Sequence, residues 1–553
     1  MPTAIAYRRA PLVDPAYTAL SDAAVHADGL IQQLSERVLK LVDVQQMSAL
    51  DAIVATKLGG YTQTPPMPDL SALAQQLPGN VSAFVESAYA ASLTAAMNRD
   101  KEAMLSVLDA MQAFAAALPH VSEEALFKAG ADVLRLTVDL YRRTGQRFLL
   151  DLLENLRSRL PDVSGVMHSF PFQSDYQPEK GQHSAQEQEY YDRMERFATG
   201  KLTADSLAMS ALLSQYSGSG RDAAAARTGL AALMRYHGMP SGAFSADPYL
   251  AGRDPARAAD LTAVCAQAEA YLDALLTTGE AAMAEKLEML LVNVLPDLLT
   301  ENGVRTLAPT NRLFDDDSCT AVEKADKADV SALLRAVYAL RRSVWLSRDD
   351  GTLAYMLPVS GGCLTRLNGV PMRFTARVSG VFHKEIAIRV ECRQSVQATL
   401  KVRIPAYAEE AQMAVGGEKL QSVPKGGMVD VKRTFHNGDV IRIVLTLAPR
   451  METGWRGSAS VYVGAQLMAL ALPDTNVSWR YAVIRSLPMT QVEDEGVPYV
   501  LITSCEAPAW REKSGFITPP PQDVPMGPAY ELTLIPAAGA DGRIAAFPCV
   551  RER

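Results

Sequence analysis

The sequence has no long apolar run and no closely spaced cysteines. No hydrophobic segment approaches the roughly 18 residues that a membrane-spanning helix requires. Residues 1–30 contain neither the apolar stretch nor the small-residue cleavage site of a secretory signal. The six cysteines are scattered between Cys265 and Cys549, which is not the spacing of a disulfide framework. We therefore expect a cytoplasmic protein that does not enter a membrane.

Positive charge and aromatic residues are also in short supply. The chain has 54 Lys and Arg against 62 Asp and Glu, a formal net charge of −8. A nucleic-acid-binding protein would normally present a basic face to the phosphates, so we expect no nucleic-acid partner. Aromatic residues make up 7% of the chain and include four tryptophans. A long binding groove lined with aromatic rings is therefore not expected.

The chain has the composition of an average globular protein but is too long for one core. Hydrophobic residues make up 48% of its 553 residues and charged residues 21%, and a chain of this length normally forms two or three domains. The pattern changes near residue 345, from alanine-rich helical spacing to short alternating segments. We expect residues 1–345 to form a helical domain, 346–455 a β-sandwich and 456–553 a second β-sandwich.

The helical half contains a weak repeat. Apolar residues recur at helical spacing over 104–118 and 148–160, which predicts two amphipathic helices. A short polar turn followed by such a helix occurs at residues 98–108, 144–156 and 278–290, and the first two copies lie 46 residues apart between Asp100 and Gln146. Helix pairs of this period are typical of either a solenoid or a closed ring, and the periodicity is compatible with both.

The second half reads as strands and turns. Residues 386–392 and 399–405 alternate with the period of a strand. Glycine turns follow at Gly416-Gly417, Gly426-Gly427 and Asn437-Gly438. The proline cluster at 519–525 is expected to form a loop within the last domain.

Several segments, in the same order along the chain, resemble one known family. Residues 236–261 contain Tyr-His-Gly, Ser-Gly-Ala-Phe-Ser and Leu-Ala-Gly steps, and residues 284–299 contain Lys-Leu-Glu followed by Asn-Val-Leu-Pro. Residues 400–420 and 437–447 carry an Arg-Ile-Pro step, a Gly-Gly turn and an Asn-Gly-Asp turn. Together these segments resemble glycoside hydrolase family 127, the β-L-arabinofuranosidase-like family. The resemblance implies an (α/α) barrel, a toroid of helical hairpins, followed by β-sandwich domains, and so favours the ring.

The same resemblance implies chemistry whose residues are mostly replaced here. Members of this family use a zinc-held cysteine thiolate as nucleophile, with one Glu and three Cys as ligands. The Glu-Leu-Cys triplet corresponds to Asp260-Leu261-Thr262, and the Cys-Cys pair to Ser318-Cys319. Serine and threonine hydroxyls are poor zinc ligands because they stay protonated near neutral pH, unlike thiolates. We therefore expect no metal and no other cofactor.

An acidic run offers a replacement for this chemistry. Residues 315–319 read Asp-Asp-Asp-Ser-Cys, and the family's acid position corresponds to Asp247. Paired carboxylates are the usual apparatus of glycoside hydrolysis. The candidate catalytic residues are therefore Asp247, Asp260, Asp317 and Cys319. The alternative is that the run is only a solvated acidic loop.

Three further residues are candidates for substrate binding. His237 would line the mouth of the barrel, or else hydrogen-bond backbone at a helix end. Asn311 and Arg312 lead into the acidic run, where Arg312 could hold a sugar hydroxyl pair or lie exposed at the surface. Other conspicuous residues have structural interpretations: ion pairs for Glu269 and Glu288, a core position for Cys265, and an inter-helix turn for residues 217–222.

Two functions fit these observations. The first is a glycoside hydrolase, arabinofuranosidase-like, whose site has been rebuilt from carboxylates and which acts on a small sugar or an arabinofuranoside-type glycoside. The second is a non-catalytic pseudoenzyme that binds a sugar or an active paralogue, or that forms a homo-oligomer. A helical scaffold without a sugar role is a third interpretation, disfavoured because the β half follows the same family order.

Overall fold

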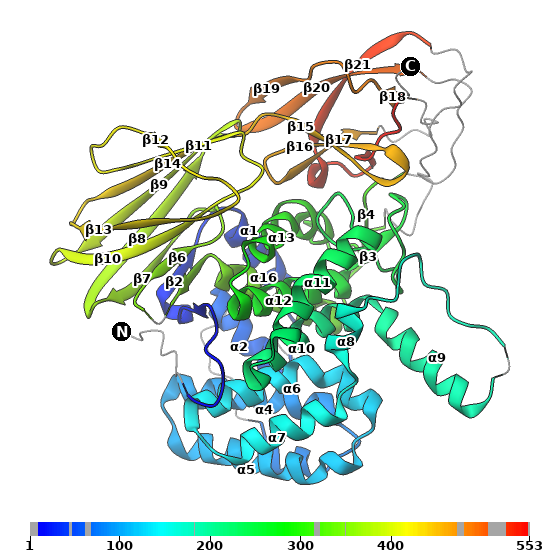
Figure 1. The fold of residues 1–553 in the computed structure, drawn as a ribbon, viewed down its shortest axis with the longest axis vertical. Coiled ribbons are helices and arrows are strands. Elements are labelled where there is room, and N and C mark those ends of the chain that lie inside the picture. Colours follow the sequence, from blue (N-terminus) through cyan, green and yellow to red (C-terminus); the bar gives the residue numbers. More distant parts are fainter. Residues whose placement is uncertain are drawn as a thin grey trace.

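The computed structural model divides into a helical part and a β part at the position that the sequence pattern indicated (Figure 1). It describes residues 9–43, 47–60, 68–181, 183–313, 321–348, 350–472, 481–506 and 527–550. Two of the candidate catalytic residues, Asp317 and Cys319, and the proline cluster at 519–525 lie outside the described residues. No helix within those ranges is long and apolar enough to cross a membrane.

Six helices of the described residues form a closed inner ring. Each packs against the next in the order α2, α4, α6, α10, α12 and α16, and α16 returns to α2. Their bounds are α2 Ala49–Leu58, α4 Val81–Asn98, α6 Glu123–Thr144, α10 Gly200–Ser217, α12 Leu261–Thr278 and α16 Lys327–Ser343. The predicted (α/α) barrel is therefore confirmed, and the ring is the correct choice over the solenoid.

The remaining helices pack around this ring or connect it. Helices α1, α3, α5, α7, α8, α11 and α13 each contact an inner helix from outside. Their bounds are α1 Leu30–Lys40, α3 Leu70–Ala74, α5 Lys101–Ala117, α7 Phe148–Arg159, α8 Val163–His168, α11 Gly220–His237 and α13 Ala281–Met289. Helix α9 (Ala185–Ala198) projects from the barrel beside α10, and a π-helix (Leu290–Val294) and α14 (Leu295–Leu298) continue α13 (Figure 1).

The sequence repeat corresponds to the turns between inner and outer helices. Residues 99–100 join α4 to α5, residues 145–147 join α6 to α7, and residues 279–280 join α12 to α13. Asp100 caps α5, because its carboxylate accepts a hydrogen bond from the Ala103 N–H at 3.0 Å. Gly145 and Gly279 end their helices with positive φ, which glycine adopts without steric cost. The predicted helices at 104–118 and 148–160 are α5 and α7.

The first β domain consists of two sheets. The five-stranded sheet has the order β1-β5-β6-β10-β13, with β1 Thr18–Ala19, β5 Trp345–Ser347, β6 Leu353–Tyr355, β10 Val396–Ile404 and β13 Gly427–Phe435. The seven-stranded sheet has the order β12-β11-β14-β9-β8-β7-β2, with β12 Gln421–Ser422, β11 Glu410–Val415, β14 Val440–Thr446, β9 His383–Cys392, β8 Val370–Ser379, β7 Gly361–Leu367 and β2 Val25–Ala27. Strands β1 and β2 come from the N-terminal segment, which the sequence pattern did not reveal.

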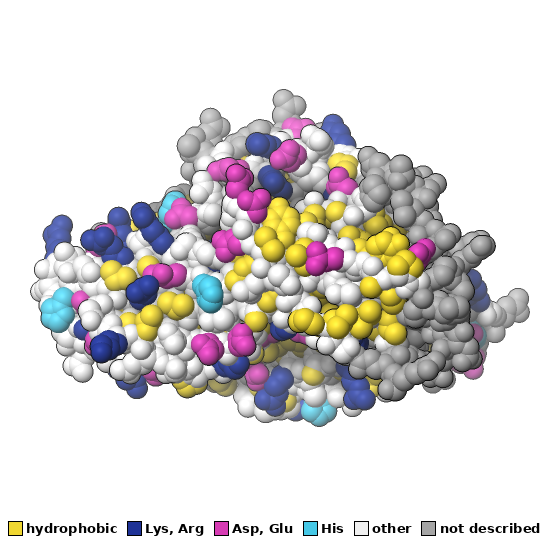
Figure 2. All heavy atoms as spheres, turned by 90° about the horizontal axis from the view of Figure 1, so that it is seen from above, with side chains coloured by type: hydrophobic (Ala, Val, Ile, Leu, Met, Phe, Trp, Pro, Cys, Tyr) yellow, Lys and Arg dark blue, Asp and Glu magenta, His cyan; other side chains and the backbone are white. Residues whose placement is uncertain are grey.

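The last β domain is one eight-stranded sheet in the described residues. Its main path is β15-β16-β17-β21-β20-β18, with β19 paired to β20 and β22 paired to β17. The bounds are β15 Arg450–Thr453, β16 Ala459–Val463, β17 Gln466–Ala471, β18 Tyr481–Val483, β19 Thr490–Asp494, β20 Val497–Glu506, β21 Ala529–Pro536 and β22 Arg543–Ile544. Hydrophobic side chains gather on part of the face seen from above in Figure 2, next to residues that are not described.

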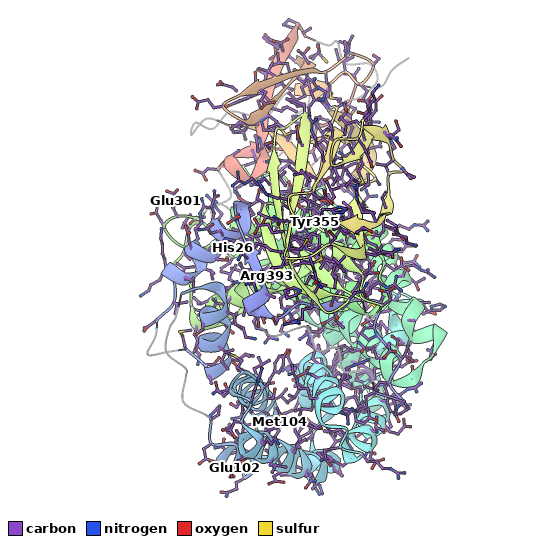
Figure 3. The ribbon with its side chains drawn as sticks, turned by 90° about the vertical axis from the view of Figure 1, so that its left-hand side faces the viewer. His26, Glu102, Met104, Glu301, Tyr355 and Arg393 are labelled. Atoms are coloured by element: carbon purple, nitrogen blue, oxygen red, sulfur yellow. The ribbon has the colours of Figure 1, made fainter. Side chains whose placement is uncertain are left out.

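Buried polar contacts fasten the barrel to the β part. Asn293, in the π-helix, donates to the Ala465 carbonyl at 2.9 Å and accepts from the Leu467 N–H at 2.8 Å. Glu288 is nearly inaccessible and pairs with Arg403 and the Tyr407 hydroxyl, so the predicted structural ion pair is confirmed. Helix α5 lies on the side of the barrel away from the first β domain (Figure 1). Figure 3 shows Glu102 and Met104, on α5, far from the strand that carries Tyr355.

Candidate functional site

Three chain segments that carry candidate residues lie side by side at one end of the barrel. Strand β3 (Ala258–Asp260) pairs with β4 (Leu307–Pro309), with Asp260 opposite Leu307. Ala246 forms a bridge with Ala259 on the other side of β3. Gly200, at the start of α10, packs so closely here that an added Cβ would lie 2.6 Å from the Cβ atoms of Ala246 and Ala263. This packing brings Asp247 and Asp260 together, beside the strand that leads to Asn311 and Arg312.

Asp260 is the N-cap of α12. Its Oδ1 accepts hydrogen bonds from the Ala263 N–H at 2.8 Å and from the Thr262 hydroxyl at 2.6 Å. Burial raises the pKa of this carboxyl, and the nearby negative charge of Asp247 acts in the same direction. The proton is therefore held more tightly on Asp260 than on an ordinary aspartate.

Asp247 is held by an arginine and by backbone. Arg257 Nε donates to Oδ2 at 3.0 Å, Arg257 Nη2 donates to Oδ1, and the Ala258 N–H donates to Oδ2 at 3.0 Å. A two-pronged guanidinium contact holds a carboxylate in a fixed orientation. Asp247 and Asp260 thus form a pair in which Arg257 orients one carboxylate and the other has a raised pKa.

His237 ends α11 inside the protein. Its Nδ1 accepts a hydrogen bond from the Gly252 N–H at 3.0 Å, so the proton is on Nε2, which donates to the Phe172 carbonyl at 2.9 Å. Burial lowers the pKa of this histidine, which keeps the imidazole neutral. The helix-end alternative is therefore confirmed, and His237 fixes the loop that contains Asp247. Its contact with a substrate stays a prediction.

Asn311 and Arg312 attach the segment before the acidic run to the last β domain. Asn311 Oδ1 accepts from the N–H groups of Ala545 and Ala546, both at 2.9 Å. Arg312 is completely buried and pairs with Asp297, which also binds Arg543 at 2.8 Å. The expectation of an exposed Arg312 is wrong, because this ion cluster encloses it. Burial alone would raise the pKa of Asp297, but Arg543 and Arg312 hold it down to about 2.

A charged cavity opens at the start of α10, next to this packing, and none of the described candidate residues lines it. This barrel-mouth cavity has a volume of about 730 Å³ and lies between the N-terminal halves of α4, α6 and α10 and helix α9. Its charged lining residues are Glu86, Glu124, Lys128, Asp132, Asp192, Glu195, Arg196, Lys201 and Arg335. The sequence analysis did not find these residues. The sequence indicates these residues only as single polar positions on otherwise apolar helices, such as Asp132 in α6.

The base of this cavity is a layer of ion pairs, which we call the central charged layer: Asp132, Arg135, Glu269 and Arg335. Arg335 binds Asp132 at 2.5 Å and Glu269 at 3.1 Å, and Arg135 also binds Asp132 at 2.5 Å. Burial would raise the pKa of Asp132, but the two arginines lower it. The structural ion pair predicted for Glu269 is therefore confirmed.

Carboxylates near the cavity differ in their proton affinity. Burial raises the pKa of Asp205, although Lys201 binds this carboxylate at 2.6 Å and opposes the shift. The Tyr249 hydroxyl donates to Glu195, and this hydrogen bond, followed by burial, raises the pKa of Tyr249 to about 12. The cavity therefore presents both fixed charges and hydrogen-bonding groups to a ligand.

Of the residues that the resemblance assigns to a zinc site, the structure describes Asp260 and Thr262 but not Ser318 and Cys319. Thr262 donates its hydroxyl to Asp260, and the same Asp260 oxygen caps α12. Cys265 is buried in the core, as predicted, and burial raises its pKa well above the ordinary value, the opposite of what a metal-binding thiolate requires. Within the ranges that the structure covers, no three His, Cys, Asp or Glu side chains are grouped to hold a metal ion.

Comparisons with known proteins place this architecture. Residues 359–447 match the family model of the β-L-arabinofuranosidase GH127 middle domain. A solved structure described as a glycoside hydrolase has a TM-score of 0.73 at 12% identity, covering 98% of this chain and 99% of its own. A GH127 β-L-arabinofuranosidase from Geobacillus stearothermophilus has a TM-score of 0.62 at 14% identity, covering 95% and 91%.

A third similar structure, a GH127 β-arabinofuranosidase, has a TM-score of 0.59 at 13% identity and covers 97% of this chain and 98% of its own. No curated protein gives a significant match. The match to the family model and the shared fold confirm the resemblance drawn from the sequence motifs.

Proposed function

We propose that this protein binds a small glycoside in the barrel-mouth cavity and does so without zinc–thiolate chemistry. The match to the family 127 middle domain and the fold shared with family 127 enzymes support a role in carbohydrate binding. The observation that carries the proposal is the cavity itself: about 730 Å³, at the end of the barrel where Asp247 and Asp260 meet. Carboxylates, lysines and arginines are suitable partners for sugar hydroxyls because hydrogen bonds to charged groups are strong.

The absence of zinc chemistry is part of this proposal and rests on the donor set. The family's Glu and first Cys are Asp260 and Thr262 here, and these two side chains bind one another and the start of α12. A protonated hydroxyl in place of a thiolate removes both a ligand and a negative charge. We therefore propose that the protein needs no cofactor, and that it is a pseudoenzyme with respect to the family reaction.

A second candidate function is hydrolysis by carboxylates, and the Asp247–Asp260 pair favours it. Two neighbouring carboxyl groups with different proton affinities can supply a general acid and an ionised partner. Asp260 has the raised pKa that an acid needs, and Asp247 is the member that Arg257 and backbone hold in a fixed orientation. Asp317 and Cys319, the other two candidate catalytic residues of the sequence analysis, would contribute to the same hydrolytic site.

Binding and hydrolysis are separated by one set of measurements. Isothermal titration of the full chain with methyl β-L-arabinofuranoside should give saturable binding. Lys128→Met, which changes an exposed side chain of the cavity, should weaken it, and Lys432→Met, on the sandwich, should not. The same protein is assayed against aryl glycosides with and without a chelator. The proposal would be refuted if neither methyl β-L-arabinofuranoside nor any of the aryl glycosides bound.

Turnover has its own diagnostic outcomes. Chelator-resistant turnover that Asp260→Asn abolishes would establish the carboxylate mechanism, whereas turnover lost on chelation would refute the proposed absence of zinc. No turnover combined with saturable binding is the result expected for the pseudoenzyme.

The remaining proposals concern context. We propose the cytoplasm as the compartment, supported by five described cysteines that are all buried and unpaired. We also propose the division into 1–345, 346–455 and 456–553, with β1 and β2 joining the sheets of the second unit and β15 joining the sheet of the third. A homo-oligomer or an active paralogue is the proposed protein partner, which copurification from the native source would identify.

A further inference from the structure

The barrel holds a second cavity at its other end. Inner helices run from the barrel-mouth cavity, through the central charged layer, to this far-end cavity of about 810 Å³. Helix α4 shows the change of end most clearly, because Ser82 and Glu86 line the first cavity and Tyr89, Leu93 and Arg99 line the second. Arg335 borders both cavities, so the charged layer is the partition between them.

Four acids line the far-end cavity, and each already has a cation. Asp22 pairs with Lys57 at 2.9 Å and Asp139 with Arg143 at 2.6 Å. Asp273 pairs with Arg135 at 2.6 Å and Glu269 with Arg335 at 3.1 Å. The lining contains two more cations, Arg99 and Arg342, and neither lies within ion-pair distance of a lining acid.

Arg342 is the inner of these two cations. It lies on the last turn of α16, half-buried, with its guanidinium carbon 5.3 Å from the centre of the Tyr338 ring. Among the described residues, its guanidinium has no hydrogen-bond acceptor and no carboxylate within ion-pair distance. Asp22 and Asp273 stabilise its charge from beyond ion-pair distance, and its nitrogens remain available to a ligand in the cavity.

The rest of the lining suggests what kind of anion fits. The Tyr89 hydroxyl also lines the cavity and has no hydrogen-bond partner in the described part of the chain. The apolar walls consist of Leu50, Val54, Leu93, Ala96, Met97 and Leu272. A guanidinium binds the two oxygens of a carboxylate in one plane, and a hydroxyl can donate to the same group. Apolar walls favour an organic body over a bare inorganic ion.

We propose that the far-end cavity is a binding site for a small organic carboxylate, with Arg342 binding the carboxylate, Tyr89 donating a hydrogen bond to it and the apolar walls covering its body. Arg99, exposed at the end of α4, adds positive charge at the entrance. This site is separate from the glycoside site of the proposed function, because the central charged layer lies between them.

The test uses isothermal titration of the full chain with benzoate, acetate and inorganic phosphate as probes. Benzoate should bind at one site, and acetate more weakly because it lacks the apolar body. Arg342→Met should weaken benzoate binding by about tenfold or more, since the charged hydrogen bonds are lost. Arg342→Lys should retain part of the affinity, and Tyr89→Phe should lower it by a few fold.

Controls separate this site from folding and from the glycoside site. Arg227→Met, on outer helix α11, removes an exposed arginine paired with Glu280 and should leave benzoate binding unchanged. Lys128→Met should also leave it unchanged while it weakens glycoside binding. The Tm of unliganded Arg342→Met should stay close to that of the parent protein, because Asp22 and Asp273 keep their paired cations Lys57 and Arg135.

Three results would overturn the proposal. These are the absence of saturable benzoate binding, benzoate affinity unchanged in both Arg342→Met and Tyr89→Phe, or phosphate binding more tightly than benzoate. Failure of glycoside binding with intact benzoate binding would refute the proposed function alone.

Discussion

The interior of the barrel and the interior of the first β-sandwich are built from opposite materials. Trp345, Tyr355, Phe374 and Phe435 fill the sandwich, with successive ring centroids 4.6 to 6.2 Å apart. The barrel axis instead carries arginines and carboxylates, with a cavity on each side of them. An apolar, filled interior stabilises the fold, whereas a polar axis with open space beside it can bind a ligand. The difference is the reason why both proposed binding sites lie in the barrel and none in the sandwich.

The two regions also differ in how far the family signal persists. The matching family model covers residues 359–447, within the sandwich, and the barrel lies outside that match. Packing of strands tolerates few residue types at each buried position, so a sandwich can keep a recognisable pattern at low overall identity.

The largest expected effect is in the sandwich core. Trp345→Ala should lower the free energy of unfolding by about 3 to 5 kcal/mol, because a fully buried ring is replaced by a cavity. Chemical denaturation measures this change, and Trp345→Phe should lose clearly less. A small loss for Trp345→Ala would show that the sandwich core is not the support that the comparison assumes.

The next effect is at the buried cluster between barrel and last β domain. Asp297→Asn should cost about 3 kcal/mol, because Arg312 and Arg543 are left without their anion. The folded pKa of Asp297, about 2, lies below its ordinary value. Its stabilising contribution is therefore complete above about pH 4 and is lost as the pH falls toward 2.

The measurement is denaturation as a function of pH for the parent and for Asp297→Asn. The two stability curves should converge at low pH. Parallel curves would mean that Asp297 titrates normally and that the ion cluster does not hold it.

A smaller effect is expected at the central charged layer. Arg335→Met should cost about 1 to 2 kcal/mol, less than the Asp297 change, because Asp132 and Glu269 remain partly open to the cavities. Both cavities border Arg335, so glycoside and benzoate affinities should change together. If the affinity for only one of the two ligands changed, the central charged layer would not be the partition between the two cavities.

The smallest expected stability effect is at Asp260. Asparagine also caps helices, so Asp260→Asn should change stability by less than about 0.5 kcal/mol, while Asp260→Ala should cost about 1 kcal/mol. Thermal denaturation distinguishes these values. Burial raises the pKa of Asp260, so the parent gains stability relative to the Asn variant as the pH falls below the folded pKa.

The sequence predicted the fold further than it predicted the site. Apolar stripes at 104–118 and 148–160 are local signals, and they became α5 and α7. The ring required the family resemblance, because helix pairs of the same period also stack into solenoids. Strands β1 and β2 escaped detection because two or three residues carry no measurable alternation.

The site residues were harder to predict from the sequence, and the reason is physical. Arg312 stands in a polar loop sequence, and nothing nearby shows that Asp297 and Arg543 will enclose it. The central charged layer joins α6, α12 and α16, which are far apart in the chain. A single polar residue on an apolar helix looks like an exposed position until a ring of helices turns it inward.

The N-terminal strands β1 and β2 impose an order on assembly. Their partners β5 and β7 follow the entire barrel in the chain. On the ribosome, residues 18–27 are therefore made before the barrel but cannot pair until the sandwich strands have been translated. This segment is among the last to dock, and its docking ties the start of the barrel to the sandwich. A nascent chain stopped before residue 345 would have a barrel whose strands β1 and β2 still lack partners.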